Sequence, residues 1–158
     1  MPLPVVLHAK RYLADAPQML ILHGFLGSGG NWSTLSRTKF STARDTYALD
    51  ARNHGRSPHT DAFSYAHMAA DVRAFMEAQG IETADVLGHS MGGKTAMTLA
   101  LTYPDRIRSL VVADMAPRAY PPGHDALLTA LQSIDLSALD SRSDADALLA
   151  DSIEDWGV

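Results

Sequence analysis

The amino-acid sequence predicts an α/β fold built on a doubly wound, mostly parallel sheet. Apolar runs of strand length recur along the chain, and stretches with helical spacing separate them. Continuous apolar runs are typical of strands covered on both faces, and alternating strands and helices favour a parallel sheet. The candidate catalytic residues fall in loops that follow predicted strands, which is where parallel sheets collect their active sites.

Length and composition limit the classes of partner. The 158 residues suit one domain, and a net charge of −5 without any basic run argues against a nucleic-acid partner. The absence of cysteine excludes disulfides and thiolate metal sites and fits a reducing cytoplasm, where we expect the protein. The N-terminus lacks a basic signal-peptide region, and no apolar segment approaches the roughly 20 residues of a membrane helix. We therefore expect no membrane partner.

The first third of the chain contains three predicted strands. Residues 4–8 are predicted as a short first strand, and residues 14–17 as the turn that ends it. Residues 19–23 are a strand of the buried, continuous apolar type, and residues 46–50 are predicted as the next strand. We expect a helix near residues 32–35 between these two strands.

The middle of the chain continues the alternation. Ser64 has the chemistry of an N-cap, and apolar residues recur at helical spacing after it until Gly80 closes the helix. A strand over residues 82–87, a helix from residue 94 to about Tyr103 and a further buried strand over residues 107–113 follow.

The alternation of predicted strands and helices stops at the end of the chain. After a Pro-Pro-Gly linker, residues 125–134 and a second segment capped by Ser143, with Asp146 three residues on, have the pattern of short amphipathic helices. This predicts a helical lid and no further sheet. We assign residues 1–118 to the core and residues 119–158 to the beginning of the lid.

The stretch around Ser90 is the candidate nucleophile site. Gly88 and Gly92 bracket the serine, an apolar run precedes it and a helix-forming run follows. The G-x-S-x-G pattern puts a serine on a strained strand-to-helix turn, where a Cβ at either glycine would collide with the packed elements. The turn lifts the hydroxyl clear of the backbone and leaves the Met91 amide near a developing oxyanion.

The loop over residues 23–30 is the candidate for a second oxyanion donor. Four glycines within seven residues allow a tight turn and a close approach of amides to a ligand. The phosphate-loop pattern is absent, and the Phe25 amide suits an oxyanion hole, with Gly24 and His23 supporting the loop. The alternative is a flexible turn before the next helix.

Two further loops carry polar residues. The loop over residues 51–59 contains turn chemistry, and its histidines, His54 and His59, lack the supporting ligands of a metal site, so we expect no metal. Asp114 follows a predicted strand and lies on the same rim as Ser90. From its position alone, Asp114 either orients a histidine or terminates the strand or caps a helix.

Three motifs together resemble the α/β-hydrolase superfamily. They are His-Gly-Phe-Leu-Gly over residues 23–27, Asp-Ala-Arg-Asn-His-Gly-Arg-Ser over residues 50–57 and Gly-His-Ser-Met-Gly-Gly-Lys over residues 88–94. The last two are similar to the small cytoplasmic esterase and thioesterase branch. This resemblance implies Ser90 as nucleophile, the Phe25 and Met91 amides as oxyanion hole and Asp114 as triad acid, without a cofactor.

One part of the pattern is missing. The family takes its general base from a late histidine, and no histidine follows His124. His89 is expected to point away from Ser90 into the fold, while His23 braces the oxyanion loop. Two more strand-helix units would each need roughly 20–30 residues, and only 44 residues follow Asp114, so we expect a chain cut within its lid.

The sequence therefore predicts a serine hydrolase of carboxylic esters, with acyl thioesters as a further substrate class. A cofactor-free perhydrolase or haloperoxidase, and an incomplete scaffold that acts as a binding module, are the alternatives. The expected partners are a small-molecule ester and a complementing C-terminal segment that carries the histidine. Self-association through the edge at residues 107–113 is the rival to that segment.

Overall fold

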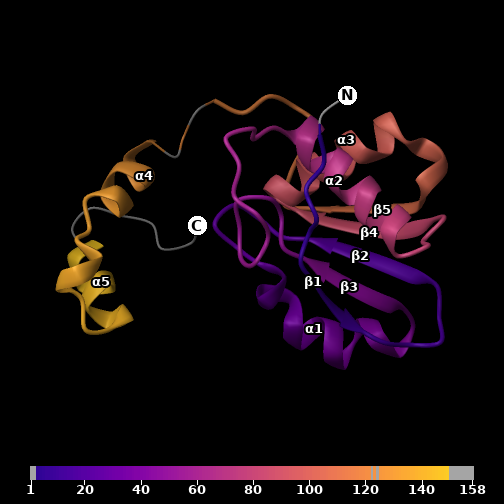
Figure 1. The fold of residues 1–158 in the computed structure, drawn as a ribbon, viewed down its shortest axis with the longest axis horizontal. Helices are drawn as coiled ribbons and strands as arrows, with labels where there is room; N and C mark the ends of the chain where they lie inside the picture. Colours follow the sequence, from indigo (N-terminus) through magenta and orange to yellow (C-terminus); the bar gives the residue numbers. More distant parts are fainter. Residues whose placement is uncertain (1–2, 122, 124, 150–158) are drawn as a thin grey trace. The chain divides into compact units, whose positions relative to one another are not determined.

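The computed structural model describes residues 3–121, 123 and 125–149. The chain divides into two compact units, Met1–Pro117 and Arg118–Val158, and each is described by itself. Figure 1 shows the chain coloured along the sequence.

The first unit is built on a five-stranded sheet, as the sequence predicts. The strand order is β1-β3-β2-β4-β5, and every neighbouring pair is parallel except β1 with β3. The chain adds β3 on one side of β2 and β4 on the other, so the order reverses at the carboxyl ends of β2 and β4, where such sheets bind ligands. The strands are β1 (Ala9–Tyr12), β2 (Gln18–Leu22), β3 (Asp45–Leu49), β4 (Ala84–His89) and β5 (Ile107–Ala113).

The predicted first strand over residues 4–8 is wrong, because β1 begins only at Ala9. Side chains, and not a strand partner, take the backbone amides of the predicted segment. The Val5 amide donates to Asp71 Oδ1 at 2.7 Å, and the His8 amide donates to Ser57 Oγ at 2.9 Å. The true edge strand is polar and exposed in its middle, so it lacks the apolar run that identified the other strands.

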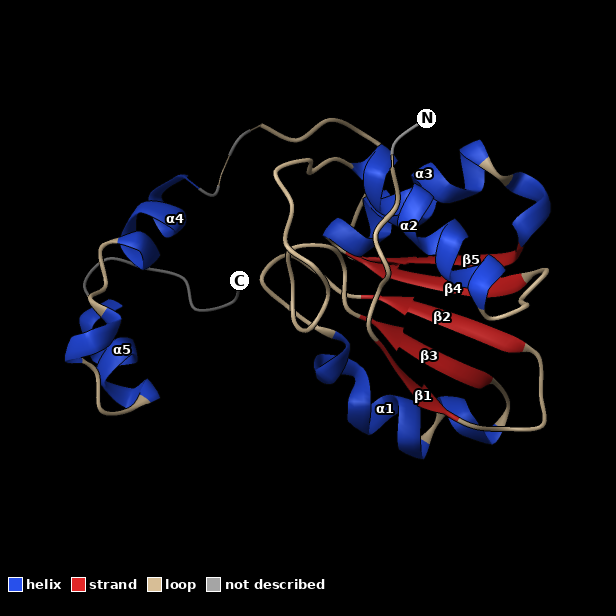
Figure 2. Cartoon of the chain, viewed as in Figure 1, coloured by secondary structure: helices blue, strands red, loops and turns tan. Residues whose placement is uncertain are grey.

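Helices cover both faces of the sheet (Figure 2). The helix α1 (Ser33–Thr38), with the flanking 3-10 turns η1 (Gly29–Trp32) and η2 (Phe40–Thr42), lies on one face. The helices α2 (Tyr65–Ala78) and α3 (Met91–Thr102) lie on the other, and η3 (Pro104–Arg106) leads into β5. Ser64 caps α2 as predicted, since its hydroxyl accepts from the His67 amide at 3.3 Å.

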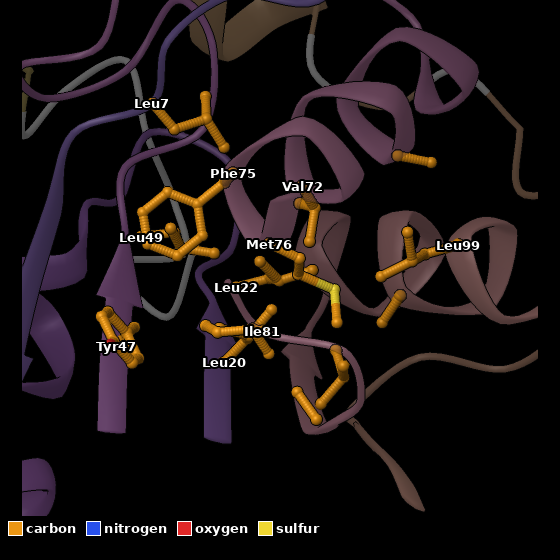
Figure 3. Packing of buried hydrophobic residues seen from close by; sticks show 14 residues of the cluster. Leu7, Leu20, Leu22, Tyr47, Leu49, Val72, Phe75, Met76, Ile81 and Leu99 are labelled. Atoms are coloured by element: carbon orange, nitrogen blue, oxygen red, sulfur yellow. The ribbon is translucent and has the colours of Figure 1, made fainter. Parts of the chain in front are cut away.

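The main core lies between the sheet and the helices α2 and α3 (Figure 3). Alternate strand residues point to this face, as the pleat requires, and the remaining ones face α1. The members from the strands and helices include Leu20, Leu22, Leu49, Val72, Phe75, Met76, Val86 and Leu99. This packing fixes the carboxyl ends of β2 and β4 relative to the start of α3.

The strand β5 forms one edge of the sheet within the described residues. Val111 is 50% exposed on it, although the strand has the apolar character of a buried one. Its amino end is anchored to β4, because Arg108 and Ser109 both donate to Asp85. Arg108, together with Ser109 and Arg44, holds the pKa of the Asp85 carboxyl well below its usual range.

The second unit contains short helices, as predicted. They are α4 (Asp125–Gln132), η4 (Leu136–Ala138) and α5 (Arg142–Leu149). The predicted cap at Ser143 is wrong, because this residue lies inside α5. The Ser141 amide donates to Asp144 Oδ2 at 2.8 Å, and the Asp144 amide approaches Ser141 Oγ at 3.4 Å, so the reciprocal cap begins two residues earlier.

Some predicted features lie outside the described residues, namely His124 and the last part of the expected lid, residues 150–158. Across the residues that are described, no helix combines the length and apolar character needed to cross a bilayer.

Candidate active site

The turn around Ser90 joins β4 to α3 through a strained backbone. Ser90 has φ 50° and ψ −114°, a conformation that side chains rarely adopt. A Cβ on Gly88 would collide with the Gly92 carbonyl, and a Cβ on Gly92 would collide with the Leu22 carbonyl. The two glycines are therefore required by the close packing of strand and helix, which is the steric reason that the sequence predicts.

The Ser90 side chain is half-buried at the rim and takes no part in capping α3. Its backbone is fixed from both sides. The Ser90 amide donates to the Ala113 carbonyl at 3.1 Å, and the Ser90 carbonyl accepts from the Lys94 amide at 3.1 Å. The hydroxyl thus stands at the N-terminus of a 12-residue helix, whose dipole favours negative charge there.

The loop after β2 packs against this turn. A Cβ on Gly24 would lie 3.4 Å from the Ser90 Cβ and 2.9 Å from His89 Nδ1, so a larger residue would have to displace the His89 ring. Phe25 follows directly, and Leu26 has a positive φ of 58°. The structure therefore brings together the two loops that the sequence predicts as oxyanion donors, at residues 25 and 91.

His23 is committed to holding this loop. The side chain is only 1% exposed, its Nδ1 lies 2.7 Å from the Gly24 carbonyl, and its Nε2 accepts from the Ala51 amide at 3.0 Å. Burial lowers the pKa of His23 below its ordinary value. With both ring nitrogens occupied, His23 has no free position for proton transfer at Ser90.

Asp114 lies beside Ser90 at the end of β5, on the same rim, as predicted. It also has a positive φ, 54°, and its side chain is 89% exposed. The carboxylate lies 3.8 Å from the imidazole of His89. The expectation that His89 points into the fold is wrong, because its side chain is 40% exposed and its ring packs edge-on against Trp32.

The loop after β3 supports the site in a way that sequence reasoning missed. Turn chemistry alone seemed to explain its composition, yet its polar side chains are hydrogen-bonded to other parts of the fold. Asp50 accepts from the Gly29 and Arg56 amides at 2.7 and 2.9 Å. Burial alone would raise the pKa of Asp50, but these hydrogen bonds outweigh it and lower the pKa.

Arg52 and His54 also attach the loop after β3 to other parts of the fold. Arg52 is 1% exposed and forms a bidentate ion pair with Asp71 of α2, at 2.7 and 2.8 Å. His54 is also buried, and its Nε2 accepts from the Leu26 amide at 3.2 Å. No local signal in the sequence marks these contacts, because their partners, Asp71 and Leu26, lie 19 and 28 residues away.

Two cavities among the described residues of the first unit are lined by neither Ser90 nor Asp114. One, of about 650 Å³, lies along β1 and the start of η1, and the other, of about 10 Å³, lies beneath the turn at Ser90. The same part of the chain contains no group of three or more metal-ligating side chains.

Comparison with known proteins identifies the family. The sequence model of the alpha/beta hydrolase fold matches residues 17–137. The abhydrolase domain-containing protein C22H12.03 of Schizosaccharomyces pombe is 40% identical over 154 residues, which cover 93% of this chain and 57% of that protein. The sn-1-specific diacylglycerol lipase ABHD11 of Mus musculus is 35% identical over 164 residues, covering 99% of this chain and 53% of the lipase.

A solved structure gives the same result. A marine microorganism esterase superposes with a TM-score of 0.90 and 37% identity, over 96% of this chain and 60% of the esterase chain. The chain spans about half the length of the curated relatives it matches. The chain belongs to the alpha/beta hydrolase family.

Proposed function

We propose that the protein is a serine hydrolase of carboxylic esters, with Ser90 as the nucleophile. The observation that carries the proposal is the strained conformation of Ser90, φ 50° and ψ −114°, on a turn that packs against the loop of Phe25. Such strain persists only where the surrounding structure imposes it, and it is found mainly at functional sites.

The reaction runs through an acyl-enzyme. Ser90 Oγ attacks the acyl carbon while a base takes its proton, and the carbonyl oxygen becomes an oxyanion held by the Phe25 and Met91 amides. Collapse of this intermediate breaks the bond between the acyl carbon and the alkoxy oxygen, which takes the proton back from the base and leaves as the alcohol, while the acyl group stays on Ser90. Water then attacks the acyl carbon in the same way and releases the acid. The positive end of α3 stabilises the negative charge in both steps.

Asp114 is the proposed acid that orients the base. Its exposed carboxylate stands at the rim beside Ser90, where a histidine from another segment has room to reach it. We propose that this histidine comes from polypeptide beyond residues 1–158, and that the segment carrying it pairs with the exposed edge of β5. Val111 is an apolar residue of this edge strand and is half-exposed, as expected of a strand that a neighbouring segment covers, and this supports the proposal.

The substrate class rests on the relatives. Proteins similar to this chain bear the names diacylglycerol lipase and esterase, and oxygen esters are therefore the proposed substrates. Acyl thioesters are a second class to test, because they would form the same acyl-enzyme on Ser90.

Labelling with a fluorophosphonate, in the protein that includes the histidine-bearing segment, tests the nucleophile. The expected result is a single adduct on Ser90, mapped by peptide mass spectrometry, and no adduct in Ser90→Ala. Ser64→Ala, which removes a serine that caps α2, is the control and should be labelled like the wild type. Absence of labelling in the wild type would favour a scaffold or binding module.

Two further assays separate the remaining alternatives. Hydrolysis of p-nitrophenyl acetate supports an esterase, whereas peroxide-dependent bromination without ester hydrolysis would point to a haloperoxidase. Light scattering together with intact mass tests the edge at β5. A complex with a second, histidine-bearing polypeptide supports the proposal, and a dimer of the 17.0 kDa chain alone supports self-association.

A further inference from the structure

Two buried histidines link the two loops beside Ser90 in a reciprocal arrangement. His23 belongs to the loop after β2, and its Nε2 accepts from Ala51 in the loop after β3. His54 belongs to the loop after β3, and its Nε2 accepts from Leu26 in the loop after β2. Each loop thus provides one histidine that holds an amide of the other loop, and the two ring centroids lie 5.2 Å apart.

The hydrogen bonds require the same tautomer in both rings. Because each Nε2 accepts an amide N–H, the ring proton must lie on Nδ1. That Nδ1–H then donates to a backbone carbonyl, which is Gly24 for His23 at 2.7 Å and Arg52 for His54 at 3.0 Å. A neutral ring makes both bonds, whereas a protonated ring would place a second N–H against an amide N–H.

These bonds fix both peptide planes around Phe25. The Gly24 carbonyl and the Phe25 amide belong to one planar trans peptide group, so holding the carbonyl sets the direction of the amide N–H. His23 holds this plane. The next plane carries the Leu26 amide, which His54 holds, and Leu26 itself has the unfavourable φ of 58°. The orientation of the Phe25 amide therefore depends on both histidines.

We infer that His54 is a positioning residue for the oxyanion hole and acts together with His23 through this arrangement. The inference rests on the proposed function, in which the Phe25 amide stabilises the oxyanion. His54 does not touch the reacting atoms. Its ring contacts Phe25 and Phe63 as well as His23, so the side chain also has apolar packing that can be kept while the acceptor is removed.

Backbone groups, and not charged side chains, occupy the four ring nitrogens of the pair. His23 is the titratable group that faces His54 from the loop after β2. On the loop after β3, Arg52 directs its guanidinium to Asp71 and gives His54 only its carbonyl, while Asp50 acts on His23 through its charge. In the described residues no carboxylate is hydrogen-bonded to either imidazole.

Two variants separate the acceptor from the packing. His54→Gln keeps an oxygen that can accept from the Leu26 amide, and His54→Phe keeps the ring contacts but removes the acceptor. His59→Phe is the control, because His59 is an exposed histidine of the same loop. Removing an oxyanion donor outright lowers rates about 10²- to 10³-fold, so a misdirected donor should cost about tenfold or more.

The first measurement needs no activity. In the ¹⁵N-labelled chain, trans-hydrogen-bond couplings are expected between the Leu26 amide nitrogen and His54 Nε2, and between the Ala51 amide nitrogen and His23 Nε2. In both rings Nδ1 should carry the proton and Nε2 should act as the acceptor. Absence of the Leu26 coupling, or a proton on Nε2 of His54, would overturn the inference.

The second measurement is the rate at which a fluorophosphonate labels Ser90 in the protein that includes the histidine-bearing segment, which wild type and variants carry alike. His54→Phe should be labelled about tenfold more slowly under conditions in which the variant is fully folded, and His54→Gln should recover most of the rate. Equal rates in His54→Phe and His59→Phe would refute the positioning role. If wild-type Ser90 is not labelled at all, the proposed function fails, and the couplings still decide the arrangement of the histidines.

Discussion

Gly92→Ala separates the effect of steric contact at the turn around Ser90 from the effect of helix propensity, because the two change the free energy of unfolding in opposite directions. Gly92 lies in the first turn of α3, where alanine would ordinarily stabilise a helix by about 1 kcal/mol. The new Cβ, however, would lie 2.6 Å from the His23 carbonyl oxygen and closer still to that of Leu22. Both neighbours are backbone atoms of a central strand and its loop, so they cannot rotate away.

The size of the expected loss in the free energy of unfolding depends on which part of the structure must move to relieve the contact. Relief requires the start of α3 to shift by roughly 1 Å, which opens gaps beneath Ala96 and Leu99, both fully buried. Overpacking of this kind costs about 3 kcal/mol at the upper end of its usual range. Subtracting the propensity gain of about 1 kcal/mol leaves a net loss of about 2 kcal/mol in the free energy of unfolding.

Urea unfolding followed by circular dichroism measures this loss. A decrease of about 2 kcal/mol should lower the midpoint by about 1 M, given the usual urea dependence of small domains. Gly93→Ala is the matched control, because its Cβ would come no nearer than 3.1 Å to Val112 Cγ1, 3.2 Å to Met115 Cβ and 3.3 Å to the Gly88 carbonyl oxygen, so the neighbours need to move much less. A Gly92→Ala variant as stable as Gly93→Ala, or more stable than the wild type, would refute the steric argument.

Three further predictions concern strain, charge and pH. Ser90→Gly should be about 1 kcal/mol more stable than Ser90→Ala by urea unfolding, because glycine removes the strain of φ 50° but loses more entropy on folding; equal stability would contradict this. Asp71→Asn should lose about 3–5 kcal/mol in the same assay, because it leaves the Arg52 guanidinium buried without its partner charge, whereas the exposed Asp105→Asn should stay within about 0.5 kcal/mol of the wild type. The pKa of His23 is lowered in the folded state, so its contribution to stability is complete above the ordinary histidine pKa and is lost as the pH falls below it. The free energy of unfolding should therefore decrease as the pH falls below about 6.5, by at most about 1.4 kcal/mol per pH unit. His23→Gln should reduce this slope.

The central sheet could be predicted because strands that are buried on both faces appear in the sequence as continuous apolar runs. The strand β5 was predicted with its observed bounds, residues 107–113, and the cap of α2 at Ser64 was predicted from local chemistry. The polar edge strand β1 was missed, since its partners are known only once β3 lies beside it. Local patterns thus identified elements whose stabilising contacts are local or uniformly apolar.

The residues of the candidate site also divide into those that the sequence could predict and those that it could not. Ser90 and its glycines were predictable because the steric demands of a strand-to-helix turn act over five residues. His54 was not, because its role depends on a loop 28 residues away in sequence, and its composition also suits a simple turn. The exposure of His89 was likewise unpredictable, since it depends on how Trp32 and Gly24 pack beside it.

A crystal structure of the chain with a phosphonate bound covalently to Ser90 tests the central claim most directly. A phosphonate adduct resembles the tetrahedral intermediate, and its oxygen reports where an oxyanion would lie. The account predicts that this oxygen lies about 2.7–3.1 Å from the amide nitrogens of both Phe25 and Met91. An adduct whose oxygen faces solvent, or contacts neither amide, would contradict it.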